Sequence, residues 1–349
     1  MLLHGIFPPI TTPFYPDGSL YLKKLEHNAA HFSRTPVAGL VVLGSTGEAV
    51  MLSDTEQKQV FKISRDAAEP EKVLIAGVGH ESARETIVSC EYVAELGYDV
   101  CMVRTPHYYK SQLKPANLLT YYRAVCDRSP LPVIIYNFPQ CTGYDMPVDV
   151  IAELAGHPNL IGIKESSGNV DKVKQIVEAT KHVKRSANVT EVFAAVTGRM
   201  TQTPSAAASS GEFVSASSLG GAATATAAPK FKTRTKEVGF QVLVGSAQKL
   251  LPSLQAGAIG AILAFANPAP TACYEIYAAW KEGNEKLAQE KQQRIVAAAT
   301  RIAGELSIPG LKYAMDLNGY YGGAVRLPLL PLLADQKEEV ERLMADLKN

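Results

Sequence analysis

The sequence predicts an α/β fold, a (β/α)8 TIM barrel with a C-terminal all-α appendage. Eight apolar runs alternate with segments of helical pattern over residues 1–269, and residues 270–349 read as helical. The eight runs are almost continuously apolar, which is typical of parallel strands covered on both faces. A doubly wound open sheet is the alternative architecture for the same pattern.

The predicted strands follow one another with room for a crossover helix between most neighbours. Each run is short, and small or polar residues end it, as expected for buried strands that emerge at one edge of a sheet. In order, the strands are expected at 5–14, 39–46, 73–79, 99–106, 132–139, 160–166, 240–247 and 257–267.

Three of the intervening helices show recognisable ends. Residues 20–33 follow a turn at Asp17-Gly18. Residues 53–68 open with Ser53 and Glu56, which form a capping-box pattern, and residues 82–96 end before Gly97, a typical C-cap residue.

One stretch does not fit the alternation. Residues 185–237 are rich in Ala, Ser, Thr and Gly and poor in large apolar groups. Such a composition buries too little surface to offset its ordering entropy. We expect a disordered insertion between the sixth helix and the seventh strand, at the barrel end opposite the catalytic one; a partner-binding or regulatory segment is the alternative.

Composition narrows the classes of function. The 349 residues are 46% hydrophobic, and 35 basic and 34 acidic residues give a net charge of +1, so neither nucleic acid nor a membrane surface is an expected partner. Five scattered cysteines without CxxC spacing favour a reducing compartment and provide no metal signature. The first residues carry no signal-peptide pattern, so we expect a cytoplasmic protein, or a mitochondrial one if a presequence was removed.

The chemistry of such a barrel lies at the carboxyl ends of its strands. Those ends carry one lysine, several tyrosines and hydroxyls, and many glycines, with no metal-ligand cluster and no phosphate-binding or dinucleotide-binding glycine motif. The segments are GSTGE (44–48), RTPHYY (104–109), YNFP (136–139), KESSG (164–168) and VGSA (244–247).

Lys164 lies inside an apolar strand. Loss of hydration disfavours its ammonium form, and a neutral amine can attack a ketone to form a Schiff base. The alternative is a lysine whose head pairs with a carboxylate; the adjacent Glu165 is expected to point to the other face of the strand.

Two further features allow two interpretations each. The GSTGE turn, with Ser45 and Thr46, offers backbone N–H groups and hydroxyls to a carboxylate or phosphate, but small-residue turns are common. Tyr136 either relays protons with Ser45 and Tyr108 or packs as an aromatic side chain at the rim. We expect His107 to be an ordinary rim histidine.

Together, GSTGE, TPHYY, IYNFP and GIKESSG, on the second, fourth, fifth and sixth strands, resemble the dihydrodipicolinate synthase/N-acetylneuraminate lyase family. The resemblance covers nearly the whole chain outside the insertion. It implies a pyruvate-dependent class I aldolase that needs no cofactor or metal. It also implies a homotetramer, a dimer of dimers.

The resemblance also implies roles for particular residues. Lys164 matches the imine-forming lysine, and Tyr136 the proton-shuttling tyrosine. Ser45 matches the relay hydroxyl, and Tyr108 the relay tyrosine lent across a dimer interface, a role that Tyr109 could fill instead. Residues matched to substrate binding are Thr46, Gly47, Ser166, Gly245 and Ile262.

One position distinguishes branches of the family. The synthases carry an arginine two residues after the YN-x-P proline, where it grips the carboxylate of aspartate semialdehyde; here Cys141 stands there. GIFPPITTPF, FQVLVGSA and IPGLKYAMDLNGYYGG are similar to 4-hydroxy-2-oxoglutarate aldolases, which yield pyruvate and glyoxylate, although that branch often has asparagine at the position of Thr46. Dihydrodipicolinate synthase and 2-keto-3-deoxy sugar-acid aldolase activities are the alternatives, and a non-catalytic oxo-acid binder is the alternative outside enzymes.

Overall fold

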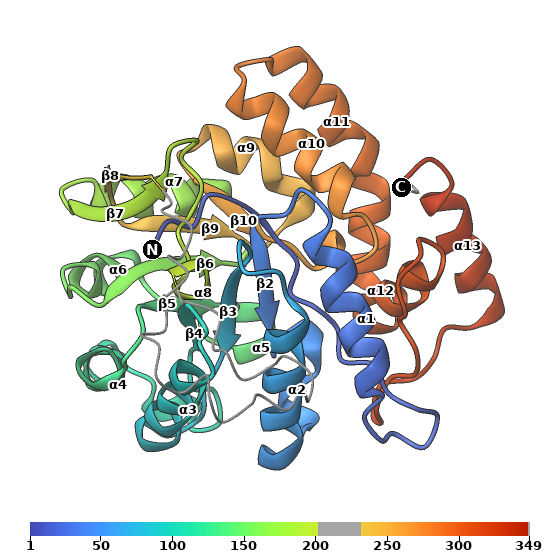
Figure 1. Cartoon of the computed structure of the whole chain (residues 1–349), viewed down its shortest axis with the longest axis horizontal. Coiled ribbons are helices and arrows are strands. Elements are labelled where there is room, and N and C mark those ends of the chain that lie inside the picture. The colour runs from blue at the N-terminus through green and yellow to red at the C-terminus, as the bar shows by residue number, and fades with distance from the viewer. Residues whose placement is uncertain (202–231, 348–349) are drawn as a thin grey trace, which may run out of the picture.

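The computed structural model describes residues 1–201 and 232–347. Eight parallel strands form one sheet in the order β1-β10-β9-β6-β5-β4-β3-β2 (Figure 1). All eight predicted strands are present, each somewhat shorter than its apolar run. Their bounds are β1 Gly5–Phe7, β2 Gly39–Val42, β3 Val73–Gly77, β4 Val100–Arg104, β5 Val133–Asn137, β6 Leu160–Glu165, β9 Gln241–Val244 and β10 Gly260–Ile262.

Backbone hydrogen bonds between the first two strand regions bring the ends of the sheet together. The Val41 N–H donates to the carbonyl of Pro8 at 3.0 Å, and the Ile10 N–H donates to the carbonyl of Val41 at 2.9 Å, as in a parallel bridge. The Ala38 N–H donates to the Ile6 carbonyl at 2.9 Å. The (β/α)8 barrel is confirmed, and the open doubly wound sheet is excluded.

Helices connect consecutive strands on the outside of the ring. The capping box of α2 is present, because Ser53 Oγ accepts from the Glu56 N–H at 3.3 Å and Glu56 Oε2 accepts from the Ser53 N–H at 2.9 Å. Gly97, directly after α3, has φ +85°, a conformation that favours glycine. The connecting helices are α1 Leu22–Ser33, α2 Asp54–Ala67, α3 Ala83–Glu95, α4 Pro115–Arg128, α6 Val148–Ala155, α7 Val170–Thr180 and α9 Leu250–Gln255.

Side chains alternate between the inside and the outside of the barrel. On β4 and β5, Met102 and Ile134 belong to the inner cluster, whereas Cys101 and Ile135 pack against the helices. Successive residues of a strand point to opposite faces, so every second side chain along these strands points into the barrel, up to the strand ends. These strands are apolar on both faces because both are buried.

The predicted insertion at 185–237 has structure at both ends. β7 (Arg185–Thr190) and β8 (Thr233–Val238) pair antiparallel, and Ala187 and Val189 pack with Leu2 at the amino end of the barrel. Disorder was therefore predicted too broadly at these two ends, because pairing satisfies their backbone groups and the barrel covers their few apolar side chains. The interior of the segment, 202–231, lies outside the described residues.

A short helix, α8, follows β7 in the connection to β8 and is tied to the same end of the barrel. In α8 (Gly198–Thr201), the Gly198 N–H donates to Asp99 Oδ1 at 3.1 Å, just before β4. Arg199 donates to the Ala68 carbonyl at 2.9 Å, at the end of α2. The segment thus lies opposite the carboxyl ends of the strands, as expected for a loop between a helix and the next strand.

Helices follow the barrel to the end of the chain, as predicted. They are α10 Pro270–Lys281, α11 Glu285–Ala298, a π-helix Ala299–Glu305, α12 Ser307–Asp316 and α13 Ala334–Met344. The segment that follows α12 contacts α1, where the Asn28 side chain donates to the Tyr321 carbonyl at 2.7 Å. The division into a barrel of 1–269 and a helical region of 270–349 remains our sequence-based proposal for the domain organisation.

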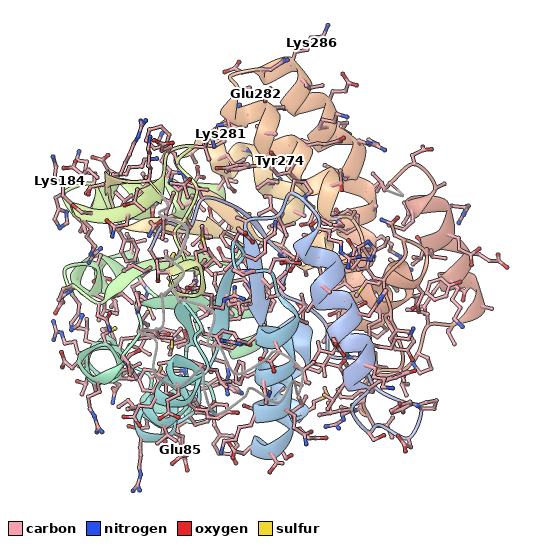
Figure 2. All side chains as sticks on the ribbon, viewed as in Figure 1. Glu85, Lys184, Tyr274, Lys281, Glu282 and Lys286 are labelled. Atoms are coloured by element: carbon pink, nitrogen blue, oxygen red, sulfur yellow. The ribbon has the colours of Figure 1, made fainter. Side chains whose placement is uncertain are left out.

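The outer surface carries charges of both signs. Exposed Glu85 on α3, Lys184 before β7, and Lys281, Glu282 and Lys286 around the α10–α11 turn project outward in Figure 2. This mixture agrees with the near-zero net charge. Among the described helices, none is long and apolar enough to cross a membrane.

Candidate active site

A cavity of about 460 Å³ opens at the carboxyl ends of the barrel strands. It gathers residues from β4, β5, β6 and β10, from the turns after β2 and β9, and from the C-terminal helices. Lining it are Ser45, Thr46, Arg104, Tyr136, Cys141, Lys164, Ser166, Gly245, Ile262, Ile308 and Leu311, among others. Most of the residues singled out in the sequence therefore meet in one place.

Lys164 occupies the inner face of β6. It pairs in register with Tyr136 of β5, is 4% exposed, and its Nζ lies 4.0 Å from the centre of the Tyr136 ring. Burial lowers the pKa of Lys164 to about 7. A large fraction of this amine is thus neutral near physiological pH, which is the form that attacks a carbonyl carbon.

No carboxylate of a described residue lies within ion-pair distance of Lys164. Glu165 points to the other face of β6, where it accepts from Asn137 Nδ2 at 2.8 Å and from the Ser167 N–H at 2.7 Å. The nearby cation is Lys172, whose Nζ lies 3.6 Å from Glu165 Oε2. The alternative in which Lys164 serves as half of a buried ion pair is therefore excluded.

Tyr136 is buried between Lys164 and the turn after β2. Its hydroxyl lies 3.2 Å from Ser45 Oγ, a hydrogen bond in which either oxygen could donate. Burial raises the pKa of Tyr136, although the Ser45 hydroxyl partly opposes the rise. The resting side chain is thus a neutral phenol with a proton to give.

The turn after β2 is a single 3-10 turn, Ser45–Gly47. Thr46 is 9% exposed and lines the cavity. Gly47 does not line it; its carbonyl accepts from Thr12 Oγ1 at 2.6 Å, which anchors the turn from below. Ser45 and Thr46 thus line the cavity that contains Lys164, whereas Gly47 holds the turn through its carbonyl.

Ser166 follows β6 and presents an unused hydroxyl. Its Oγ is buried and has no hydrogen-bond partner among the described residues. A Cβ on Gly245 would stand 1.9 Å from this oxygen, so only glycine leaves room for it. Because a buried hydroxyl without a partner is costly, this oxygen is suited to a polar atom of a bound molecule.

Tyr108 and Tyr109 do not line the cavity that contains Lys164. They are 75% and 69% exposed, and their rings stand edge to face with centroids 5.2 Å apart. Tyr108 lines a neighbouring cavity of about 290 Å³ together with Ser45 and Tyr136, and Tyr109 is not among its lining residues. Within the described chain, no hydrogen bond joins the Tyr108 hydroxyl to Ser45 or Tyr136.

Cys141 stands at the mouth on the short helix α5 (Pro139–Thr142). Burial raises the pKa of its thiol, so the side chain is uncharged at neutral pH. It therefore supplies no cation at the position where the synthases are expected to carry arginine.

Sequence reasoning missed a cationic side chain at this mouth. Arg104, the last residue of β4, lines both cavities, and its Nη1 lies 3.0 Å from Glu81 Oε1 and 2.9 Å from His107 Nδ1. His107 thus contacts both members of the Arg104–Glu81 pair. The sequence pattern could have identified it, because Arg104 stands two residues after Met102 and side chains two apart on a strand share a face. In the described part of the chain, no cluster of three or more His, Cys, Asp or Glu side chains could hold a metal.

The model of the dihydrodipicolinate synthetase family matches this chain over residues 2–185 and 221–347. The unmatched stretch falls inside the segment expected to be an insertion. Two curated relatives illustrate the range of activities. A 4-hydroxy-tetrahydrodipicolinate synthase of Methanothrix thermoacetophila is 29% identical, covering 97% of this chain and 94% of the relative. A probable mitochondrial 4-hydroxy-2-oxoglutarate aldolase of Emericella nidulans is 32% identical, covering 98% and 93%.

Among solved structures, a chloride-inhibited dihydrodipicolinate synthase from Acinetobacter baumannii in complex with pyruvate is 26% identical to this chain. It superposes with a TM-score of 0.78 over 99% of each chain.

Proposed function

The chain belongs to the dihydrodipicolinate synthetase family and is an enzyme of the class I aldolase type, and from this premise we propose that it cleaves 4-hydroxy-2-oxoglutarate to pyruvate and glyoxylate. The observation that carries the proposal is the neutral, unpaired amine of Lys164 beside the phenol of Tyr136. The absence of an arginine at Cys141 argues for cleavage rather than for condensation with aspartate semialdehyde.

The first step forms the imine. Neutral Lys164 attacks the 2-oxo carbon, and the carbinolamine hydroxyl leaves as water with a proton from Tyr136. The Tyr136 phenolate is then stabilised by the new iminium and by the Ser45 hydroxyl, 3.2 Å away. Hydroxyls of Ser45 and Thr46 hold the 2-oxo acid's carboxylate.

The second step breaks the carbon–carbon bond. The Tyr136 phenolate takes the proton of the C4 hydroxyl, the electrons of the C3–C4 bond flow into the iminium, and glyoxylate leaves. The enamine is protonated at C3, and water attacks the iminium to release pyruvate and regenerate Lys164. Ser166 Oγ, the buried hydroxyl without a partner, binds a polar atom of the substrate.

Tyr108 completes the relay across a subunit interface in this proposal. Its exposure in one chain, beside the cavity that contains Ser45 and Tyr136, supports a role in which one copy lends the side chain to another. The proposed assembly is a homotetramer built from two such dimers.

Borohydride reduction in the presence of pyruvate tests the imine. We expect a stable mass adduct on the peptide that contains Lys164, and no adduct without pyruvate. An adduct elsewhere, or none, would reject the proposal.

The synthase activity remains the second candidate because several curated relatives that match nearly the whole chain carry that name. A direct comparison separates the two. We expect cleavage of 4-hydroxy-2-oxoglutarate to exceed pyruvate consumption with aspartate semialdehyde; the reverse order would assign the chain to the synthases.

A further inference from the structure

We propose that Arg104 forms a subsite for the distal carboxylate of the substrate, the one farthest from the imine. The inference rests on the proposed function and deepens it, because it defines the substrate class as oxo acids with a second anionic group. Arg104 would then distinguish these substrates from 2-oxo acids that lack a second anionic group.

The register of the strands places Arg104 in the catalytic layer. Arg104 pairs with Tyr136, and Tyr136 pairs with Lys164, so the three residues lie side by side on β4, β5 and β6. Neighbouring strands are about 4.8 Å apart, which puts the backbones of Arg104 and Lys164 about 10 Å apart. Both side chains line the same cavity of about 460 Å³. A five-carbon oxo acid joined to Lys164 extends its far end into the space between them.

The arginine is held in position before any ligand arrives. A Cβ on Gly79 would lie 2.5 Å from the Arg104 nitrogen and 2.8 Å from its Cγ, so the arginine stem packs directly on that glycine. Glu81, 3.0 Å from Nη1, fixes the head and also accepts the N–H groups of His107 and Tyr108 at 2.9 and 3.0 Å. An arginine fixed in this way loses little freedom on binding.

One edge of the guanidinium is unused. All the hydrogen bonds of the Arg104 side chain to described residues involve Nη1. Nε and Nη2 together form a fork that matches the two oxygens of a carboxylate. Because the side chain is only 23% exposed, a charge-assisted pair here is less screened than one on the open surface.

This subsite is distinct from the one for the carboxylate beside the 2-oxo carbon. Ser45 and Thr46 lie on the turn after β2, whereas Arg104 ends β4 on the far side of β3. Cys141 offers no charge to compete for the distal group. The mouth therefore contains one arginine positioned for this purpose within the described residues that line the cavity.

Two oxo acids of equal length test the inference: 2-oxoglutarate carries the distal carboxylate, and 2-oxopentanoate does not. The measured quantity is the concentration that gives half-maximal borohydride-trapped adduct on Lys164. For the wild-type chain we expect 2-oxoglutarate to saturate at a concentration about 10–100-fold lower. In Arg104→Gln this preference should disappear, with pyruvate and 2-oxopentanoate trapped within about two-fold of wild type.

Two further variants sharpen the result. Arg104→Lys keeps the charge but not the fork, so an intermediate preference is expected; this variant also decides the matter if Arg104→Gln does not fold. Arg123→Gln removes an arginine that pairs with Glu153 on the outer surface, and it should keep the wild-type preference.

Each contrary outcome has its own meaning. Equal trapping of the two oxo acids by the wild type, or equal weakening of all three ligands in Arg104→Gln, overturns the Arg104 subsite alone. Absence of a pyruvate adduct in the wild type overturns the proposed function, and the subsite with it.

Discussion

Among the described residues, Lys164, Lys172 and Lys312 are buried, and the surroundings of Lys164 and Lys312 are opposite. Lys164 on β6 is 4% exposed, and the ring of Tyr136 is its close neighbour. Lys312 on α12 is 1% exposed, but its Nζ lies 2.5 Å from Glu48 Oε1 and donates to the carbonyls of Thr12 at 2.8 Å and Ala324 at 2.6 Å. Burial lowers the pKa of both lysines, and for Lys312 the Glu48 carboxylate opposes that effect.

The comparison shows that burial alone does not make a lysine a nucleophile. Lys312 donates hydrogen bonds to two carbonyl oxygens and forms an ion pair with Glu48, and these partners favour its ammonium form over the neutral amine. Lys164 lacks such partners among the described residues, and the neutral form is the cheaper one in its surroundings.

Lys312 also helps to fix the turn that faces Lys164. Glu48 follows directly after the turn that carries Ser45 and Thr46 and adopts φ +55°, a strained conformation for a side chain of this kind. Lys312 and the Arg326 N–H, 3.1 Å from Glu48 Oε2, hold it there. α12 and the segment that follows it thus stabilise the turn that faces Lys164.

Replacing the unpaired lysine gives the sharpest test of the comparison. We expect Lys164→Met to lower turnover by at least about 10⁴-fold, because no other described amine lines the cavity. Folding should be retained, since methionine fills a similar volume without a group to desolvate. Steady-state cleavage assays and urea unfolding measure the two effects, and substantial remaining turnover would contradict the role of the amine.

Replacing the paired lysine should do the reverse. Lys312→Met leaves the Glu48 carboxylate buried without its cation, and we expect a loss of about 3–5 kcal/mol in the free energy of unfolding. Urea unfolding measures the loss. The double variant Glu48→Gln with Lys312→Met should recover part of it, because the uncompensated charge is gone. A loss below about 1 kcal/mol in the single variant would show that the pair is not the anchor of this turn.

Tyr136→Phe separates chemistry from burial beside Lys164. The ring and its contact with the amine remain, but the proton donor is lost, so we expect turnover to fall by about 10²-fold. The imine with pyruvate should still be trapped, more slowly. Rapid-quench borohydride trapping checks this, and an unchanged turnover would remove Tyr136 from the relay.

The two lysines should differ in their response to pH. Imine formation should rise with pH through about 7 and level off above it, so the trapping rate at pH 6 should be about tenfold below the plateau. In Glu48→Gln, which leaves Lys164 and Tyr136 themselves unchanged, the midpoint should stay near 7. A midpoint above pH 9 in the wild type would mean that Lys164 is hydrated or paired.

The pH dependence of the free energy of unfolding tests the same property of Lys164, with a smaller expected effect. The pKa of Lys164 is about 7 in the folded chain against an ordinary value of 10.5, so between these values the unfolded chain binds the additional proton. The free energy of unfolding therefore rises with pH across this window. We expect urea unfolding at pH 7 and pH 9.5 to show a larger gain for wild type than for Lys164→Met.

Local patterns in the sequence were enough for the strands, the helix ends and the place of Lys164. Continuous apolar runs identify buried parallel strands, Ser53 and Glu56 identify a helix start, and an amine inside such a run is unusual wherever it occurs. These properties depend on neighbours within a few residues. The resemblance to a known family predicted that Ser45, Tyr136 and Ser166 share one site, and all three line the same cavity in the structure.

Sequence patterns could not predict the properties that depend on contacts between distant segments. Only the folded chain brings Lys312 and Arg326 against Glu48, leaves the Ser166 hydroxyl without a partner among the described residues, and brings Glu81 and His107 to Nη1 of Arg104. The paired ends of the 185–237 segment likewise depend on a strand partner more than forty residues away and on the amino end of the barrel. Desolvation and ion pairing are set by everything within a few ångströms, and sequence fixes residue order but not those distances.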